Sequence, residues 1–150
     1  VKAGRVPVAD AAARLADPAV GDLGYATLDL HRQERCGFPE VVLAEGKTPD
    51  WAAGAIRRLA EAGQDAFATR VNDEQAARLA AEFPQAEQNR LARTFWLPTP
   101  GWVAAELGQV WVVTAGTGDL PVAEETLVTA RVMGARAGLI ADVGVAGVHR

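Results

Sequence analysis

The sequence predicts an α/β fold in which parallel strands alternate with helices, arranged as two successive units. Short apolar runs rich in β-branched residues recur along the chain, and segments of helical period separate them, as in βαβ units. The prolines and glycines of PTPGWVAAELG interrupt this pattern and indicate a linker. We therefore divide the chain into an N-terminal helix and loop (1–35), an N-terminal α/β domain (36–98), a linker (99–109) and the start of a second α/β domain (110–150).

The first elements lead up to one strand. PVADAAARLA (7–16) predicts a short helix with a proline in its first turn, and the charged stretch 21–40 reads as a loop. VVLA (41–44) is a short, continuous apolar run, which predicts a strand buried on both faces.

A helix is expected directly after this strand. Thr48 can cap it, Pro49 suits its first position, and Gly63 supplies its stop. The apolar face of this helix is formed by Trp51, Ala55, Ile56 and Leu59.

A second strand and helix repeat the pattern. DAFATRV (65–71) predicts a strand, and Asn72 with Gln75 forms a capping-box pair that opens the next helix. NRLARTFWL (89–97) predicts a third strand. Together these elements predict a βαβαβ unit over residues 40–97, with a mainly parallel sheet and right-handed crossovers.

The second unit repeats the pattern once. QVWVVTAG (109–116) predicts a buried strand, residues 120–134 predict a helix, and AGLIADVGV (137–145) predicts another strand. Two parallel strands and one helix bury too little apolar area to be stable alone. We therefore expect this βαβ unit to open a larger α/β domain.

The overall composition excludes several classes of protein. A net charge of −4 and a pI near 5.2 argue against non-specific nucleic-acid binding, which needs a basic face. The single cysteine, Cys36, cannot form an internal disulfide and suits a reducing cytosol. No apolar stretch approaches the roughly 20 residues of a membrane span, and no secretory leader is visible. We expect a cytoplasmic protein without membrane or nucleic-acid partners.

AEGKTPD (44–50) places Gly-Lys-Thr between a strand and a helix, which suggests a nucleotide phosphate loop. A Walker-type loop needs a glycine five residues before its Gly-Lys pair, but Val41 occupies that position before Gly46. Two interpretations stay open. Lys47 and the following helix amides can hold a single phosphate or carboxylate, or Gly46 simply makes the turn and Lys47 is solvated.

VVTAGTGDLPVAEE (112–125) is a richer junction between a strand and a helix. Ligands of open parallel sheets bind beyond the carboxyl ends of the strands, where this loop lies. Gly116 lets the backbone approach a ligand, and Thr117 and Asp119 can bond hydroxyls or phosphate oxygens. The alternative is that Asp119 is only a helix cap. A third glycine is missing, so this is not a dinucleotide fingerprint.

The terminal DVGVAGVHR places His149 and Arg150 just beyond a second parallel strand, beside the same loop if the two strands are neighbours. A histidine there can transfer protons near neutral pH, and an arginine can bind a carboxylate or phosphate bidentately. The alternative is a pair of solvated surface residues.

GFPEVVLAEGKTP, RLARTFWL, VVTAGTGDLPVAEETLVTA and DVGVAGVHR closely resemble the LarB family, in family order and spacing over nearly the whole chain. The resemblance implies a small N-terminal α/β domain followed by a PurE-like (flavodoxin-like) parallel-sheet domain. It implies an enzyme of nickel-pincer nucleotide biosynthesis that carboxylates the pyridinium ring of nicotinic acid adenine dinucleotide. Carbon dioxide or bicarbonate is the co-substrate, Mg²⁺ is expected, and AMP is released. The intact protein is expected to be a homo-oligomer.

The resemblance also assigns residues. Gly116, Thr117 and Asp119 align with the PurE-like phosphate and ribose loop, although the family more often has serine where Gly118 stands. His149 and Arg150 align with the segment that faces the substrate, His149 being the candidate catalytic residue. Five residues of the N-terminal unit match family motif positions without an assigned role: Arg32, Arg35, Glu40, Lys47 and Thr48. We place Lys47 and Arg35 near the phosphates of the dinucleotide as a hypothesis.

The family's catalytic cysteine would lie beyond Arg150. Cys36 belongs to the N-terminal motif ERCGFPE, and we expect it to be a small, partly buried thiol. These 150 residues alone are therefore expected to be inactive. Two alternatives remain: an enzyme like aminoimidazole ribonucleotide (AIR) carboxylase that acts on another nucleotide, or a stand-alone nucleotide-binding or regulatory module.

Overall fold

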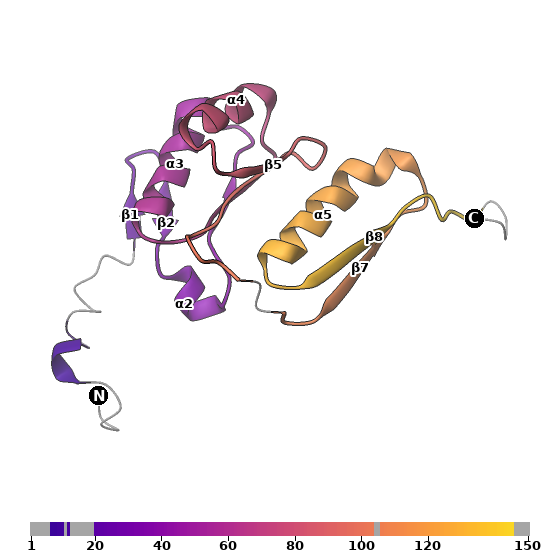
Figure 1. The fold of residues 1–150 in the computed structure, drawn as a ribbon. Coiled ribbons are helices and arrows are strands. Elements are labelled where there is room, and N and C mark those ends of the chain that lie inside the picture. Colours follow the sequence, from indigo (N-terminus) through magenta and orange to yellow (C-terminus); the bar gives the residue numbers. More distant parts are fainter. Residues whose placement is uncertain (1–6, 11, 13–19, 104–105, 146–150) are drawn as a thin grey trace.

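The computed structural model describes residues 7–10, 12, 20–103 and 106–145, in which two α/β units follow one another along the chain (Figure 1). The helix expected over 7–16 is helical at its described residues 8–10 and 12, and its remainder lies outside the described residues. The elements of the first unit are β1 (Val20–Asp22), β2 (Thr27–Asp29), α2 (Arg32–Cys36), β3 (Val41–Leu43), α3 (Pro49–Glu61), β4 (Ala66–Thr69), α4 (Asp73–Glu82), β5 (Glu87–Asn89) and β6 (Thr94–Leu97). Those of the second are β7 (Gln109–Val113), the 3₁₀ turn η1 (Thr117–Asp119), α5 (Leu120–Val132) and β8 (Arg136–Ile140).

The stretch 21–40, expected to be a loop, instead contains the antiparallel hairpin β1–β2 and the short helix α2. Its turn is held by Asp22, whose Oδ1 accepts from the backbone N of Gly24 at 2.7 Å, and Gly24 adopts φ +76°. Leu28 buries its side chain from β2. The strands have three residues each, too few for a clear alternation in the sequence.

The central sheet has the order β3-β4-β6-β5. β3 and β4 are parallel, as predicted, which confirms the α/β class. The prediction of a mainly parallel sheet is wrong for β6, which runs antiparallel to both of its neighbours, β4 and β5. The strand expected over 89–97 is in fact divided: Asn89 ends β5, a turn follows, and Thr94 begins β6.

The two helices of this unit begin where the capping residues predict. Thr48 Oγ1 accepts from the backbone N of Trp51 at 3.2 Å, and Pro49 opens α3. Asn72 and Gln75 form the full capping box of α4. The helix α3 ends just before Gly63, which adopts φ +69°.

Two burial predictions for β3 and α3 need correction. Leu43, in the edge strand β3, is 52% exposed, whereas its neighbour Val42 is buried, so β3 is buried on one face only. Trp51 is 43% exposed rather than part of the core, and its ring stacks on Tyr25 with 4.9 Å between centroids. Tyr25 comes from the hairpin turn that the sequence did not reveal.

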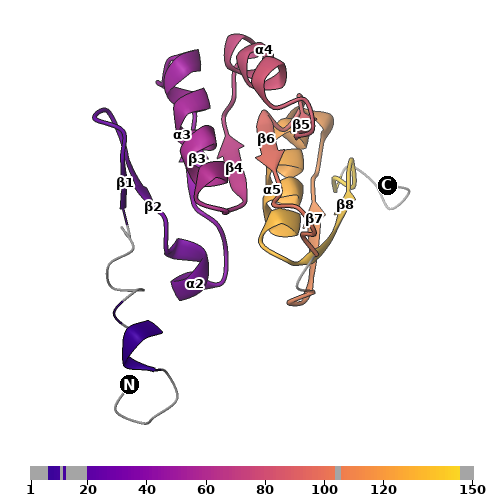
Figure 2. The same ribbon diagram turned by 60° about the vertical axis from the view of Figure 1, so that its left-hand side comes forward.

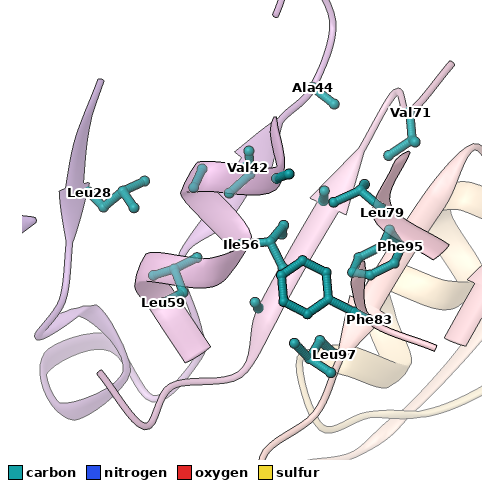
Figure 3. Packing of buried hydrophobic residues seen from close by; sticks show 14 of the residues in the cluster. Leu28, Val42, Ala44, Ile56, Leu59, Val71, Leu79, Phe83, Phe95 and Leu97 are labelled. Carbon is teal, nitrogen blue, oxygen red and sulfur yellow. The ribbon is translucent and has the colours of Figure 1, made fainter. Parts of the chain in front are cut away.

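The hydrophobic core lies between α3, α4 and the sheet (Figure 3). Ile56 and Leu59 of α3, Leu79 of α4 and Phe95 of β6 are fully buried. All residues of this core cluster lie between Leu28 and Leu97, so the first unit has a core of its own.

The second unit is the predicted βαβ. β7 and β8 are parallel neighbours, with Val113 paired to Ile140 at their carboxyl ends, and α5 packs against both strands. The prediction that the first of these strands is buried is wrong for these residues: Trp111 is 58% and Val113 59% exposed. Within the described residues, α5 covers one face of this two-stranded sheet, and the exposed side chains of Trp111 and Val113 show that β7 is not covered on both faces.

Among the described residues, two side-chain hydrogen bonds join the units. Arg70, which follows β4, donates from Nε to Glu125 Oε1 of α5 at 3.1 Å. Asn89 at the end of β5 donates from Nδ2 to Glu124 Oε2 at 2.9 Å. The strand β5 therefore lies beside α5, as both views show (Figure 2). Within the described residues, no helix has the length and apolar character needed to span a bilayer.

Candidate functional site

The loop between β7 and α5 is the first part of the candidate site. Thr117–Asp119 forms a 3₁₀ turn that leads directly into α5, so the first amides of the helix lie beside its exposed side chains. Asp119 occupies the N-cap position, but its side chain makes no capping hydrogen bond. The cap interpretation of Asp119 therefore does not account for its carboxylate, which stays accessible to a ligand.

The loop after β8 lies against the loop after β7. Thr114, which is buried, links them: its backbone N donates to Ile140 O at 3.0 Å, and its carbonyl accepts from the N of Val143 at 3.1 Å. The backbone N of Asp142 also donates to Thr114 Oγ1 at 3.4 Å. Because neighbouring parallel strands end at one edge, both loops lie at the same rim of the sheet.

Gly144 makes the closest approach between these loops. A Cβ built on Gly144 would stand 2.8 Å from the carbonyl oxygen of Ala115, a distance that real Cβ atoms do not show. A side chain at this position would therefore push the two loops apart.

A pocket of about 300 Å³ opens between β7 and the first turns of α5. Its walls are mostly apolar, from Val113, Val122 and Ala123, and Asp119 and Thr126 supply polar groups. A small apolar hollow with a few polar groups is typical of a ligand site.

Four other residues are predicted for this site: Gly116, Thr117, His149 and Arg150. Gly116 is half-buried and Thr117 is exposed, both in the loop just described. His149 and Arg150 lie outside the described residues. Residues 141–145, which lead toward them, adjoin the loop at Ala115.

Lys47 lies in the turn beyond the carboxyl end of β3. Its ammonium donates to Leu43 O at 2.6 Å, and its carbonyl accepts from Gln75 Nε2 at 2.7 Å. Gly46 adopts φ +77°, as the turn requires. Gly46 thus makes the turn, as the structural interpretation expects, but Lys47 is half-buried and bonded rather than solvated, and an anion would have to compete with Leu43 O for its ammonium.

Arg35 lies in α2, before β3, so Arg35 and Lys47 are beyond opposite ends of this strand. The Arg35 guanidinium forms an ion pair with Asp29. The structure therefore does not bring these two cations to one phosphate site. Cys36, at the end of the same helix, is exposed, so the prediction of a partly buried thiol is wrong.

Arg32 and Glu40 form a second pair in this region. Arg32 Nη1 lies 3.8 Å from Glu40 Oε2, and the Arg32 guanidinium lies over the ring of Phe38 at 5.2 Å. Burial raises the pKa of the Glu40 carboxyl, and the Arg32 charge opposes this rise. The Arg35 charge also lowers this pKa, but burial outweighs both cations, and the Arg32–Glu40 contact agrees with a structural role for these two residues.

Two arginines that the sequence patterns did not single out lie where the first unit meets the second. Arg70 and Arg93 both adopt positive φ, +57° and +55°. Arg70 follows the carboxyl end of β4, a position that the strand-end rule could have indicated. Arg93 gave no such signal, because it was placed inside the strand expected over 89–97.

No group of three or more His, Cys, Asp or Glu side chains among the described residues is arranged to hold a metal ion. Mg²⁺ often needs only one or two carboxylates when substrate phosphates supply the other ligands. Asp119 fits that limited requirement.

Comparisons with known proteins agree with this architecture. Residues 20–99 match the family model described as the LarB/PurE-like N-terminal domain. The chain is also 37% identical, over 130 residues, to an uncharacterised protein of Methanocaldococcus jannaschii; the match covers 82% of this chain and 50% of that protein. The chain thus spans about half the length of the curated relative that it matches.

Proposed function

The chain belongs to the LarB/PurE-like family, and from that premise we propose that the whole protein is a pyridinium-3,5-biscarboxylic acid mononucleotide synthase. Its substrate is nicotinic acid adenine dinucleotide, its co-substrate is carbon dioxide or bicarbonate, and AMP is released. The product is an intermediate of the nickel-pincer nucleotide cofactor.

The reaction requires a nucleophile, because an electron-poor pyridinium ring cannot attack carbon dioxide. A thiolate that adds at C4 creates an enamine, whose electron pair at C5 forms the new bond to carbon dioxide. Loss of the C5 proton and departure of the thiolate restore the aromatic ring. Water then cleaves the phosphoanhydride. In this proposal the thiolate comes from the family's cysteine and not from Cys36, because Cys36 belongs to the N-terminal motif ERCGFPE and lies in α2 of the first unit.

In this proposal the loops at the rim of β7 and β8 bind the nucleotide. Gly116 allows close approach, the Asp119 carboxylate accepts hydrogen bonds from the ribose hydroxyls, and the Thr117 hydroxyl donates to a phosphate. His149 transfers a proton and Arg150 binds a carboxylate or phosphate. The observation that chiefly supports this assignment is the exposed carboxylate of Asp119, which takes the N-cap position without capping the helix.

Mg²⁺ would neutralise the phosphoanhydride charge when bound. Asp119 would be its protein ligand in this part of the chain, with the phosphates supplying the others.

The test is a product assay on the full-length protein. Incubation with nicotinic acid adenine dinucleotide, ¹³C-bicarbonate and Mg²⁺ is expected to give AMP and a labelled biscarboxylate mononucleotide by mass spectrometry. Residues 1–150 alone are expected to give neither product, because they lack the family's cysteine. AMP release without incorporation of label, or robust carboxylation by the 150-residue chain, would contradict the proposal.

The same assay addresses two alternatives. Carboxylation of aminoimidazole ribonucleotide, with no reaction of the dinucleotide, would indicate an AIR-carboxylase-like enzyme. The separate core of the first unit, between Leu28 and Leu97, favours an independent module as the other candidate. Nucleotide binding by residues 20–99, without any activity of the full-length protein, would support that reading.

A further inference from the structure

The first unit places its strand ends on the same side of the molecule as the Thr117–Asp119 loop. β4 and β5 both run antiparallel to β6 and are therefore parallel to each other. At the end of β5, Asn89 bonds Glu124, in the first half of α5. At its beginning, Glu87 lines a pocket with Arg131, near the end of α5. The carboxyl ends of β4 and β5 thus point toward the N-terminus of α5, where Thr117–Asp119 lies.

The Arg70–Glu125 contact indicates how far the carboxyl end of β4 lies from the Thr117–Asp119 loop. Glu125 is six residues after Asp119, which corresponds to about 9 Å along the axis of a helix. Arg70 Nε lies 3.1 Å from Glu125 Oε1. A phosphate bound beside Arg70 is therefore too far from Asp119 to be the phosphate that the Thr117–Asp119 loop itself binds. A dinucleotide that starts at this loop is long enough to reach it.

Arg93 is held in a fixed position at this edge. Its Nη2 donates to Arg70 O at 3.2 Å, its Nε lies 3.4 Å from Val71 O, and its own carbonyl accepts from the N of Val71 at 2.8 Å. A guanidinium has five N–H groups, so three remain for a ligand. An arginine already oriented by carbonyl groups loses little further entropy when it binds an anion.

Within the described residues, no carboxylate forms an ion pair with Arg93. At the same edge, Arg70 is paired with Glu125 and Arg90 with Asp73. The positive φ of Arg93 belongs to the turn between β5 and β6, so the observation that points to an anion is its guanidinium, which is oriented by carbonyls and has no carboxylate partner among the described residues.

We propose that Arg93 is the residue with which the N-terminal unit binds the distal phosphate of a dinucleotide held at the Thr117–Asp119 loop. This inference rests on the proposed function, which supplies the dinucleotide. It gives the N-terminal unit a role in selecting dinucleotides over mononucleotides, since a mononucleotide at the loop has no phosphate at this distance.

The test compares two ligands in three variants of the full-length protein. R93N removes the guanidinium but keeps a residue that tolerates positive φ, so the turn is preserved. R93K restores the charge without the planar fork. R131Q is the matched control, because Arg131 also donates to a backbone carbonyl, that of Ala137 at 3.2 Å, but lies about 18 Å along the helix from Asp119. Calorimetry measures binding of nicotinic acid adenine dinucleotide and of nicotinic acid mononucleotide, and circular dichroism checks the fold.

R93N is expected to weaken dinucleotide binding by about tenfold and mononucleotide binding by less than about twofold. R93K is expected to recover part of the loss, and R131Q to bind both ligands like the wild type. Unchanged binding by R93N, an equal loss for both ligands, or R93K as weak as R93N would overturn the inference. Wild-type protein that binds the dinucleotide without carboxylating it contradicts the proposed function alone.

Discussion

Gly144 lies against the carbonyl oxygen of Ala115. A Cβ on Gly144 would be only 2.8 Å from this oxygen, so no side chain fits at this position. The contact joins the loop after β8 to the loop after β7. It is supported by the hydrogen bond from Val143 N to Thr114 O. The spacing of the two loops that form the candidate site is therefore fixed by the absence of one side chain.

Gly144→Ala is expected to separate these loops and weaken the site. Because the obstructing atom belongs to the backbone, the loop must move, and overpacking of this kind costs about 1 kcal/mol of unfolding free energy. A displacement at a reacting centre can lower kcat/KM by about 100-fold. Steady-state kinetics of the full-length protein measure this effect. Ala141→Ser, which adds an atom at an exposed position of the same loop, should leave kcat/KM unchanged; an equal fall in both variants would refute the steric explanation.

Asp119→Ala separates ligand binding from helix capping. Asp119 makes no capping bond, so its loss should change the free energy of unfolding by less than about 0.5 kcal/mol while weakening nucleotide binding. Asn72→Ala is the opposite control: Asn72 Oδ1 accepts from Gln75 N at 2.8 Å, and such caps contribute about 1 kcal/mol. Urea denaturation and nucleotide titration of both variants test the pair. A destabilised Asp119→Ala with normal binding would make Asp119 a structural cap.

Local signals in the sequence were sufficient for the parts of the fold that depend on local chemistry. Thr48 with Pro49, and Asn72 with Gln75, mark the starts of α3 and α4 because a cap acts within three residues. The strand–turn–helix at Thr117 was found for the same reason.

Features that depend on distant contacts could not be predicted in this way. The direction of β6 depends on which strand it pairs with, and a turn after Asn89 reverses the chain within the segment expected to be a single strand. Trp51 is apolar and on the expected helix face, yet it lies outside the core because Tyr25 covers it from the unrecognised hairpin. The position of Arg93 beside Arg70 likewise appears only once β4 and β6 are paired.

Gln75 also binds two backbone carbonyls outside the capping box. Because Gln75 is buried, loss of these hydrogen bonds should lower the free energy of unfolding. Its Nε2 donates to Ala44 O at 2.8 Å and to Lys47 O at 2.7 Å, and the side chain is fully buried. Gln75→Leu would leave both carbonyls without this donor, at a cost of about 3 kcal/mol. Chemical denaturation measures the loss. Gln88→Leu is the control, since Gln88 makes one long bond of 3.4 Å to Ala76 O; an equal loss there would mean that these bonds contribute little.

The contact between α3 and α4 should weaken in acid through Glu82. Burial tends to raise the pKa of the Glu82 carboxyl, but hydrogen bonds from Arg57 Nε (2.6 Å) and Arg78 Nη1 (2.5 Å) outweigh it, so the pKa lies below its ordinary value of 4.5. A carboxyl with a lowered pKa in the folded state stabilises the fold above pH 4.5, and this contribution is lost as the pH falls through the folded-state pKa.

Glu82→Gln should therefore lower the free energy of unfolding at pH 7, by less than about 1 kcal/mol because the pairs are partly solvated. The difference from the wild type should shrink as the pH falls below the ordinary glutamate range, because the wild-type carboxyl is then protonated as well. Denaturant titrations between pH 3 and pH 7 test this convergence. A difference that stays constant across this range would mean that Glu82 acts through packing and not through its charge, since only the charge titrates.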